Sequence, residues 1–263
     1  MDYSSMKYER KGNALLLTFT NPDSLNSLSS EVLVEFEAVL NEIEELAGKD
    51  KTIRSLILTG AGRAFIAGAD IGQMKSMTAV EACEFSRHGN RVLKKLESLR
   101  LPVIAAVNGF ALGGGLEVVL ACDFAYISKK ARIGLPEATL GIIPGFCGNK
   151  RLTDRIGKAA AKEMIYTGRM LDAAEALRLG IVNRICEPEE LIDEVLALSL
   201  EMDKTSPNSV AEAKEILNLC CDNDIETMLA FETNKFGLVF SHPDGVEGKN
   251  AFIDKRKPQW RKN

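Results

Sequence analysis

The feature that most constrains this chain is a glycine-rich turn between two apolar segments. Residues 103–107 form an apolar run rich in β-branched side chains, which is typical of a strand buried on both faces. The turn that follows contains Gly109 and then three glycines in a row at 113–115. Residues 116–122 are apolar apart from one acid and are interpreted as a helix. Because glycine lets a ligand approach the main chain closely, we expect the free N–H groups at this helix start to face a ligand.

Glu117 is the one carboxylate in this predicted helix. A helix start of this kind suits a phosphate or a developing oxyanion. An acid in the first turn of a largely buried helix should be partly desolvated, which raises the pKa of a carboxyl group. The alternative is that Glu117 simply complements the helix dipole.

A second carboxylate, Glu137, lies in a loop rich in proline and glycine that follows a strand-like run at 123–128. It comes 20 residues after Glu117 (137 − 117). Two carboxylates at one site suit general acid–base chemistry, because each alters the titration of the other. The spacing by itself leaves open whether the two side chains meet.

Three segments resemble one known family. The stretch NGFALGGGLEVVLACD followed by GLPEATLGIIPG is similar to the signature of the enoyl-CoA hydratase/isomerase family, or crotonase superfamily. FIAGADI resembles the family segment whose backbone N–H forms half of an oxyanion hole, which maps to Ala69. The second N–H maps to Gly114. Two such amides, placed about 2.7–3.1 Å from a thioester oxygen, would stabilise an enolate.

The expected elements favour an α/β fold, since strands and helices alternate along the chain. Strands are expected at residues 3–9, 14–20, 55–59, 103–107 and 123–128, and helices at 30–47, 78–99, 116–122, 159–167, 172–179, 188–202, 209–221 and 224–240. The resemblance, which runs from about Tyr8 to Trp260, implies a crotonase-like spiral of repeated ββα units. Residues 1–200 would form this core with the acyl-CoA site. Residues 201–263 would form a helical C-terminal subdomain involved in oligomerisation and in contact with coenzyme A.

The resemblance implies a hydratase. Such an enzyme adds water to a 2-enoyl-CoA thioester to give a 3-hydroxyacyl-CoA, and acts as a dehydratase in reverse. Glu117 as a carboxylate would help to activate the water, and Glu137 would supply the proton to the α-carbon. An enoyl-CoA delta-isomerase or a cyclic dienoyl-CoA hydratase is the alternative within the family. A non-catalytic acyl-CoA or RNA-binding protein is the alternative outside it.

Further residues map to substrate-binding positions of the family. Asp23 stands where relatives commonly carry a lysine near the coenzyme A phosphates, so Arg63 is the candidate replacement cation. Phe236 and Lys255 map to positions near coenzyme A, the lysine often from a neighbouring subunit. The other substrate-binding candidates are Ala67, Asp70, Ile71 and Gly145.

A second departure from the family lies after Gly145. Cys147, Asn149 and Lys150 stand where the family usually reads G-T-Q in a GxGGTQRL string. These changes could reshape the pocket for the acyl group.

Composition argues against several other classes of protein. The net charge of −4, with acids and bases interspersed, is unlike a nucleic-acid-binding surface. The two histidines provide neither a zinc cluster nor a Ser-His-Asp triad, so we expect no metal. The turn from Gly109 to Gly115 also lacks the G-x-G-x-x-G spacing of a dinucleotide site.

The same features bear on location and partners. Charges interrupt every window of about 20 residues, and the N-terminus lacks the pattern of a signal peptide, so we expect no membrane association. The six cysteines show no C-x-x-C spacing and are interpreted as reduced thiols of a cytoplasmic protein. The partner would be an acyl-CoA thioester, with coenzyme A as part of the substrate and no separate cofactor. The family implies a homotrimer or homohexamer.

Overall fold

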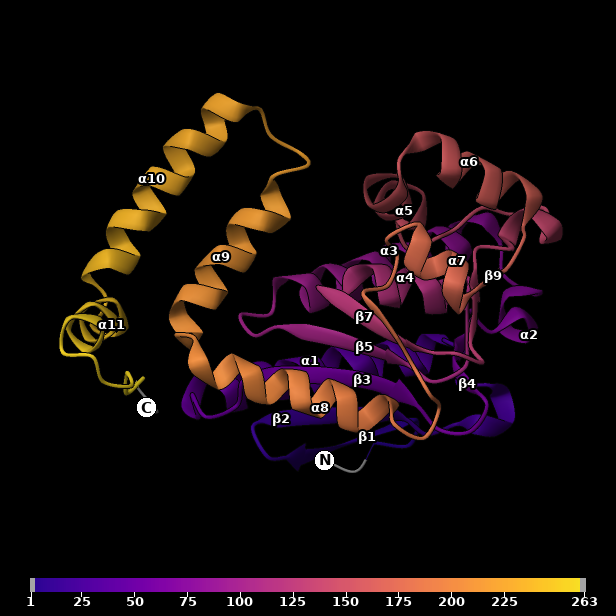
Figure 1. The fold of residues 1–263 in the computed structure, drawn as a ribbon. Coiled ribbons are helices and arrows are strands. Elements are labelled where there is room, and N and C mark those ends of the chain that lie inside the picture. Colours follow the sequence, from indigo (N-terminus) through magenta and orange to yellow (C-terminus); the bar gives the residue numbers. More distant parts are fainter. Residues whose placement is uncertain (1–2, 261–263) are drawn as a thin grey trace.

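Two β-sheets divide the strands of the chain between them in the computed structural model, which describes residues 3–260 (Figure 1). The larger sheet has six strands in the order β1-β2-β3-β5-β7-β10, and the smaller has four in the order β4-β6-β8-β9. From β3 to β8, the first strand of each pair joins the larger sheet and the second joins the smaller. A helical segment follows each pair, so the α/β class and the repeated ββα units are confirmed.

The strands are β1 (Met6–Lys11), β2 (Ala14–Phe19), β3 (Ser55–Gly60), β4 (Ala64–Ala67), β5 (Val103–Val107), β6 (Phe110–Leu112), β7 (Phe124–Ser128), β8 (Arg132–Gly134), β9 (Leu171–Asp172) and β10 (Arg184–Cys186). The α-helices are α1 (Ser30–Lys49), α2 (Ile71–Met74), α3 (Ala79–Ser98), α4 (Gly114–Ala121), α5 (Gly148–Ile156), α6 (Lys158–Thr167), α7 (Ala173–Arg178), α8 (Leu191–Glu201), α9 (Pro207–Leu219), α10 (Ile225–Ser241) and α11 (Pro243–Ile253). Short 3-10 helices are η1 (Pro22–Ser24), η2 (Glu137–Leu140) and η3 (Met202–Lys204).

The central strands β3 and β5 of the larger sheet are buried throughout and mostly apolar, because helices cover both of their faces. Leu56 and Leu58 of β3 belong to the large core cluster, which also includes side chains from α1 and α3. Ile57, between them, faces a smaller cluster that includes Leu191 and Val195 of α8. Figure 1 shows α8 crossing this face of the sheet. Alternate residues therefore bury on opposite sides, which explains the uninterrupted apolar pattern.

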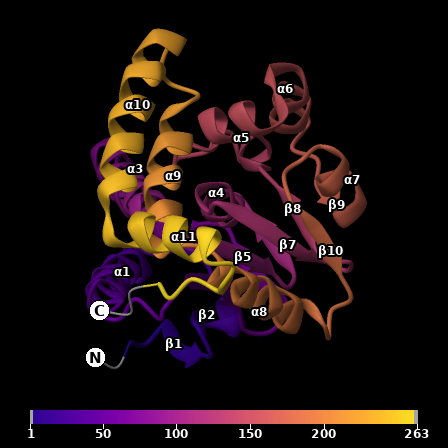
Figure 2. The same ribbon diagram turned by 60° about the vertical axis from the view of Figure 1, so that its left-hand side comes forward.

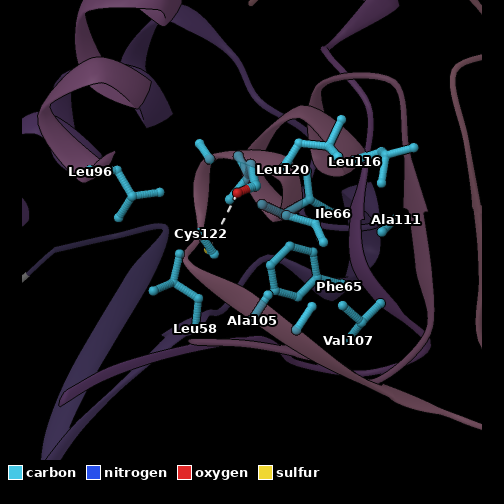
Figure 3. Packing of buried hydrophobic residues seen from close by; sticks show 14 of the residues in the cluster. Leu58, Phe65, Ile66, Leu96, Ala105, Val107, Ala111, Leu116, Leu120 and Cys122 are labelled. Carbon is cyan, nitrogen blue, oxygen red and sulfur yellow. Dashed lines mark hydrogen bonds between the residues drawn. The ribbon is translucent and has the colours of Figure 1, made fainter. Parts of the chain in front are cut away.

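The smaller sheet brings the carboxyl ends of three parallel strands to one edge. Ala67 of β4 pairs with Leu112 of β6, and Leu112 pairs in turn with Gly134 of β8. Helix α4 then passes directly over β4, since a Cβ on Gly115 would lie 1.9 Å from the carbonyl oxygen of Ile66. Only glycine permits that approach. Figure 3 shows the core around α4, where Leu116 packs in one cluster with Ile66.

The last helices extend away from the two sheets. Figures 1 and 2 show α9 and α10 side by side, with α11 below them. Lys214 anchors α9, because its buried Nζ donates to Asp123 Oδ2 at 2.8 Å and to the carbonyl oxygen of Leu101 at 3.0 Å. Lys235 of α10 pairs with Glu212 of α9 at 2.6 Å. Among residues 3–260, no helix has the length and apolar character needed to cross a membrane.

Candidate active site

Glu117 lies in the first turn of α4 and is only 1% exposed. Its Oε1 accepts hydrogen bonds from the backbone N–H of Phe146 at 2.8 Å and of Gly148 at 2.7 Å. Burial, with a smaller contribution from the nearby carboxylate of Glu137, raises the pKa of Glu117 to about 7, while the two amides and Arg151 oppose the shift. The carboxyl group therefore gains or loses its proton near neutral pH.

Glu137 begins η2, with two residues between it and the end of β8, and is 9% exposed. A Cβ on Gly113 would lie 3.1 Å from Glu137 Oε1, so this oxygen rests against the turn before α4. Within the described residues, the buried Glu137 Oε2 has no hydrogen-bond partner. Burial raises the pKa of Glu137 and so favours the protonated acid. A buried oxygen without a protein partner is a place where a water molecule or a substrate can bind.

The fold brings the two carboxylates near each other, a point that the sequence spacing by itself left open. Gly113 touches Glu137 and immediately precedes the helix that carries Glu117. The electrostatic effect of Glu137 on the pKa of Glu117 reflects the same proximity. Pairs of titratable groups in different surroundings are typical of acid–base sites.

Two backbone amides, those of Ala69 and Gly114, lie at the same edge. Ala67 of β4 and Leu112 of β6 are paired in the sheet. Ala69 comes two residues after Ala67, and Gly114 comes two residues after Leu112. A Cβ on Gly113 would lie 3.7 Å from the Cα of Gly68, so the two chain segments are adjacent.

Both amides are available as donors. Leu28 donates to the carbonyl of Gly68 and accepts from the N–H of Asp70, which leaves the N–H of Ala69 outside this bridge. Gly114 is the first residue of α4, where an N–H has no partner inside the helix. Over residues 3–260, neither amide donates to another protein group. The pair can bind one oxygen that develops negative charge.

The remaining candidates on β4 and α2 have mainly structural contacts. The N–H of Ala67 donates to the carbonyl of Leu25 at 3.0 Å. Asp70 caps α2, because its Oδ1 accepts from the N–H of Gln73 at 3.1 Å. Ile71 is exposed beside it. All three candidates lie within four residues of Ala69 in the chain and so flank the site.

Gly145 lies in the loop that holds Glu117. Its carbonyl oxygen accepts from Ser86 Oγ at 2.5 Å and from Asn90 Nδ2 at 3.1 Å. The structure therefore places Gly145 beside the catalytic candidates, one residue before an amide that binds Glu117.

Arg63 lies on an exposed loop next to the segment that carries Asp23. A Cβ on Gly62 would lie 2.9 Å from the Cβ of Pro22, so the loops touch. Buried Asn26 ties them together, donating to the carbonyls of Ala61 and Ala64 at 3.0 and 2.9 Å. In the described part of the chain, the Arg63 guanidinium forms no ion pair.

Phe236 and Lys255 lie apart from the carboxylates of their own chain. Phe236 is on α10, is 69% exposed, and packs on Phe240 with ring centroids 5.9 Å apart. Lys255 follows α11 in an exposed turn with a φ of 54°. Figure 1 shows α10 and α11 on the far side of α9 from α4.

Sequence reasoning missed the groups that hold Glu117. The amides of Phe146 and Gly148 are its donors, and Cys147 between them has a φ of 66°. Arg151 supports this loop, because Nη1 donates to the carbonyl of Phe146 at 2.5 Å. The clustered glycines at 145 and 148 were the available signal, since such segments often place backbone N–H groups around an acid or an anion.

Comparisons with known proteins agree along the full chain. A family model described as "Enoyl-CoA hydratase/isomerase" matches residues 9–263. The "Short-chain-enoyl-CoA hydratase" of Clostridium acetobutylicum is 42% identical, with 100% of both chains covered. The "Crotonyl-CoA hydratase" of Syntrophomonas wolfei is 38% identical, with 98% of both covered. A crystal structure of enoyl-CoA hydratase from Bacillus anthracis is 35% identical and has a TM-score of 0.91, covering 98% of this chain and 99% of that one.

Proposed function

The chain belongs to the enoyl-CoA hydratase/isomerase family, its activity is that of an enoyl-CoA hydratase, and we propose that it acts on short 2-enoyl thioesters through Glu117 and Glu137. Water adds across the α,β double bond to give a 3-hydroxyacyl-CoA, and the reverse reaction is a dehydration. The observation that carries the assignment of residues is one strand edge with two buried carboxylates and two amides that have no acceptor among residues 3–260. The short acyl chain is supported by the names of the relatives.

The thioester oxygen would accept hydrogen bonds from the amides of Ala69 and Gly114. These donors stabilise the negative charge that develops when water attacks the β-carbon. Main-chain amides do not titrate, so the oxyanion hole would work over the whole pH range of the reaction.

The carboxylates would move the two protons. Both amides that hold Glu117 bind its Oε1, which leaves Oε2 to accept a proton from the attacking water. Burial raises the pKa of Glu137, and its protonated form would give its proton to the α-carbon. One proton is taken and one is given, so the chemistry requires no redox group, and a proton transfer between the acids completes the cycle.

Coenzyme A would be held by groups outside this edge. Arg63 is an exposed cation without an ion-pair partner in the described residues, which suits a phosphate. Phe236 on α10 and Lys255 after α11 would approach the nucleotide of a neighbouring copy, since these helices lie away from α4 of their own chain (Figure 1). The core at 1–200 and the helical part at 201–263 would thus have separate roles, although residues 1–2 and 261–263 lie outside the described structure.

The exposed apolar surface of the last two helices supports a homotrimer or homohexamer. This surface is formed by Phe236, Leu238, Phe240, Phe252 and Ile253. Exposed apolar groups in such number are typical of an interface. The six cysteines are all free, which supports a reducing, cytoplasmic location.

Loss of the enoyl-thioester absorbance of crotonyl-CoA tests this proposal, with longer 2-enoyl thioesters measured in parallel. We expect rapid loss with crotonyl-CoA, slower loss with longer chains, and none in the Glu117→Gln/Glu137→Gln double variant. A 3-enoyl-CoA substrate provides the comparison with an isomerase. Conversion of the 3-enoyl but not the 2-enoyl thioester would contradict the assignment.

A further inference from the structure

One face of α3 grips the loop that holds Glu117. Four residues of this face, here called the α3 clamp, are Phe85, Ser86, Gly89 and Asn90. Ser86 Oγ and Asn90 Nδ2 both donate to the carbonyl of Gly145, at 2.5 and 3.1 Å. The clamp therefore fixes the loop one residue before the first amide that binds Glu117.

The ring of Phe146 fills the space that a side chain at position 89 would occupy. A Cβ on Gly89 would lie 2.2 Å from Cε1 and 2.3 Å from Cδ1 of this ring. Phe85 packs against the same ring, with centroids 5.3 Å apart. Phe146 is 2% exposed, so its ring is enclosed by the protein. Glycine in the middle of a helix is unfavourable by about 1 kcal/mol, and here the ring supplies a physical reason for it.

Phe146 also contacts the second half of the site. A Cβ on Gly114 would lie 3.3 Å from Cε2 of the Phe146 ring. The backbone of Phe146 meanwhile donates its N–H to Glu117 and its carbonyl accepts from Arg151. A single residue is thus in contact with the catalytic carboxylate through its main chain and with an oxyanion donor through its ring.

We propose that Phe146, seated against Gly89, is a positioning residue that holds the loop amides on Glu117 and supports Gly114. The inference rests on the proposed function, because it assigns this packing to the same hydration site. It also concerns the segment in which this chain departs from the family's usual string, since Cys147, Asn149 and Lys150 follow directly.

The charged groups that face Glu117 are few, so the effect of the amides can be isolated. Glu137 approaches from η2 and Arg151 from α5, and Arg151 Nε pairs with Glu97 of α3 at 2.5 Å. Strands β4 and β6, which pack on α4, carry no titratable side chain. Tyr126 of β7 lies in the cluster on the opposite face of the sheet. Withdrawal of an amide donor from Glu117 would therefore raise the pH at which this carboxylate forms.

The decisive variants are Gly89→Ala, Phe146→Ala and the double variant, assayed as kcat/KM for crotonyl-CoA against pH. We expect Gly89→Ala to lower kcat/KM at least tenfold and to move the acidic limb of the profile upward by about one unit. Phe146→Ala should move the limb in the same direction. In the double variant the added methyl group finds the space that the ring has left, so its effect should largely disappear.

Two further variants complete the test. Gly48→Ala is the matched control, because Gly48 also lies in a helix and a Cβ there meets nothing within 4 Å. We expect its activity and pH profile to be unchanged. Phe146→Leu, which keeps an apolar side chain in the same space, should restore much of the lost activity. If Gly89→Ala fails to fold, the pH profiles of Phe146→Ala and Phe146→Leu are compared instead.

A purely structural role for this packing predicts a different pattern. Folded enzyme would become scarcer or less stable, while the acidic limb would stay at its original pH and the two substitutions would act additively. That result would overturn the inference while leaving hydratase activity intact. Absence of hydratase activity in the unmodified chain would instead contradict the proposed function, so the two failures are distinguishable.

Discussion

The strand edge that carries Glu117 and Glu137 differs from the last two helices, α10 and α11, in how far its side chains are buried and bonded within one chain. At the edge, Glu117 is 1% exposed and has two amide donors, and the buried Oε2 of Glu137 has no hydrogen-bond partner among residues 3–260. On α10 and α11, the apolar side chains of Phe236 and Phe252 are 69% and 85% exposed. The chemistry of hydration can therefore be assembled within one chain, whereas the helices that would contact coenzyme A carry a surface suited to a second copy.

The largest expected effect is the loss of activity when either carboxylate is replaced, which would sharpen this contrast. Glu117→Gln and Glu137→Gln should each lower kcat for crotonyl-CoA by about 10²–10⁴-fold, because each removes a proton-transfer group from the transition state. Circular dichroism should show unchanged folding. Glu45→Gln is a suitable control, since Glu45 is exposed and pairs only with Lys49 of its own helix. If either active-site variant were as active as the control, that carboxylate would not be a proton-transfer group.

The second effect is on stability, which we expect to fall as the pH rises. The folded-state pKa of Glu117 is raised from 4.5 to about 7, so the folded protein keeps this proton to higher pH than the unfolded chain does. The contribution of Glu117 to stability is present below pH 4.5 and is lost as pH rises to about 7, by an amount on the order of 3 kcal/mol. Urea unfolding at pH 5 and pH 8 measures it. Glu117→Gln should show a smaller loss between these pH values than the unmodified chain, and an equal loss would contradict the buried placement.

The third effect concerns assembly. Phe252→Ser should weaken self-association at least tenfold, because burial of one large apolar side chain stabilises an interface by about 1.5–3 kcal/mol. Sedimentation at several protein concentrations gives the measurement. Val34→Ser, which changes an exposed apolar residue on α1, serves as the control. Unchanged association of Phe252→Ser would remove the basis for treating α11 as an interface.

The fourth effect concerns the nucleotide of the substrate. Lys255→Ala should raise KM for crotonyl-CoA by about three- to tenfold with little change in kcat, since it removes one charge far from the reacting atoms. Crotonyl-pantetheine, which lacks the nucleotide, should show no such change. Lys257→Ala tests whether any lysine of this segment has the same effect. A change in kcat alone would place Lys255 in a different role.

The smallest expected effect is a change in the free energy of unfolding caused by one residue, Cys147. Cys147 has a φ of 66°, a conformation that glycine adopts without strain. Cys147→Gly should therefore stabilise the protein by about 0.5–1 kcal/mol, measured by urea unfolding. The control Cys83→Gly, on helix α3, should act in the opposite direction by about 1 kcal/mol. Destabilisation by Cys147→Gly would mean that the thiol has contacts of its own.

Much of the large sheet could be predicted from the sequence. The strand Val103–Val107 was predicted with its observed limits, and α1 begins at the predicted Ser30. The first strand begins at Met6 rather than at residue 3, and α4 begins at Gly114 and includes two of the glycines assigned to the turn. Long apolar or periodic segments carry their own signal, so errors there were confined to the ends.

The strands of the small sheet could not be predicted in the same way. β4, β6 and β8 contain only four, three and three residues. No periodicity is visible in segments of that length, and the glycines around them indicated only turns. Yet these strands place Ala69, Gly114 and Glu137 at one edge.

The sequence by itself determined which groups were available for chemistry. An acid among apolar residues, glycines before a helix and a second acid in a proline-flanked loop indicated buried carboxylates and free amides, because burial and backbone freedom depend on local residue types. Only the tertiary structure decided that Phe146 and Gly148 hold Glu117, that one oxygen of Glu137 has no partner in the described part of the chain, and that α10 lies apart from α4 (Figure 1). Those outcomes depend on contacts between segments far apart in the chain, which strand pairing and side-chain packing create.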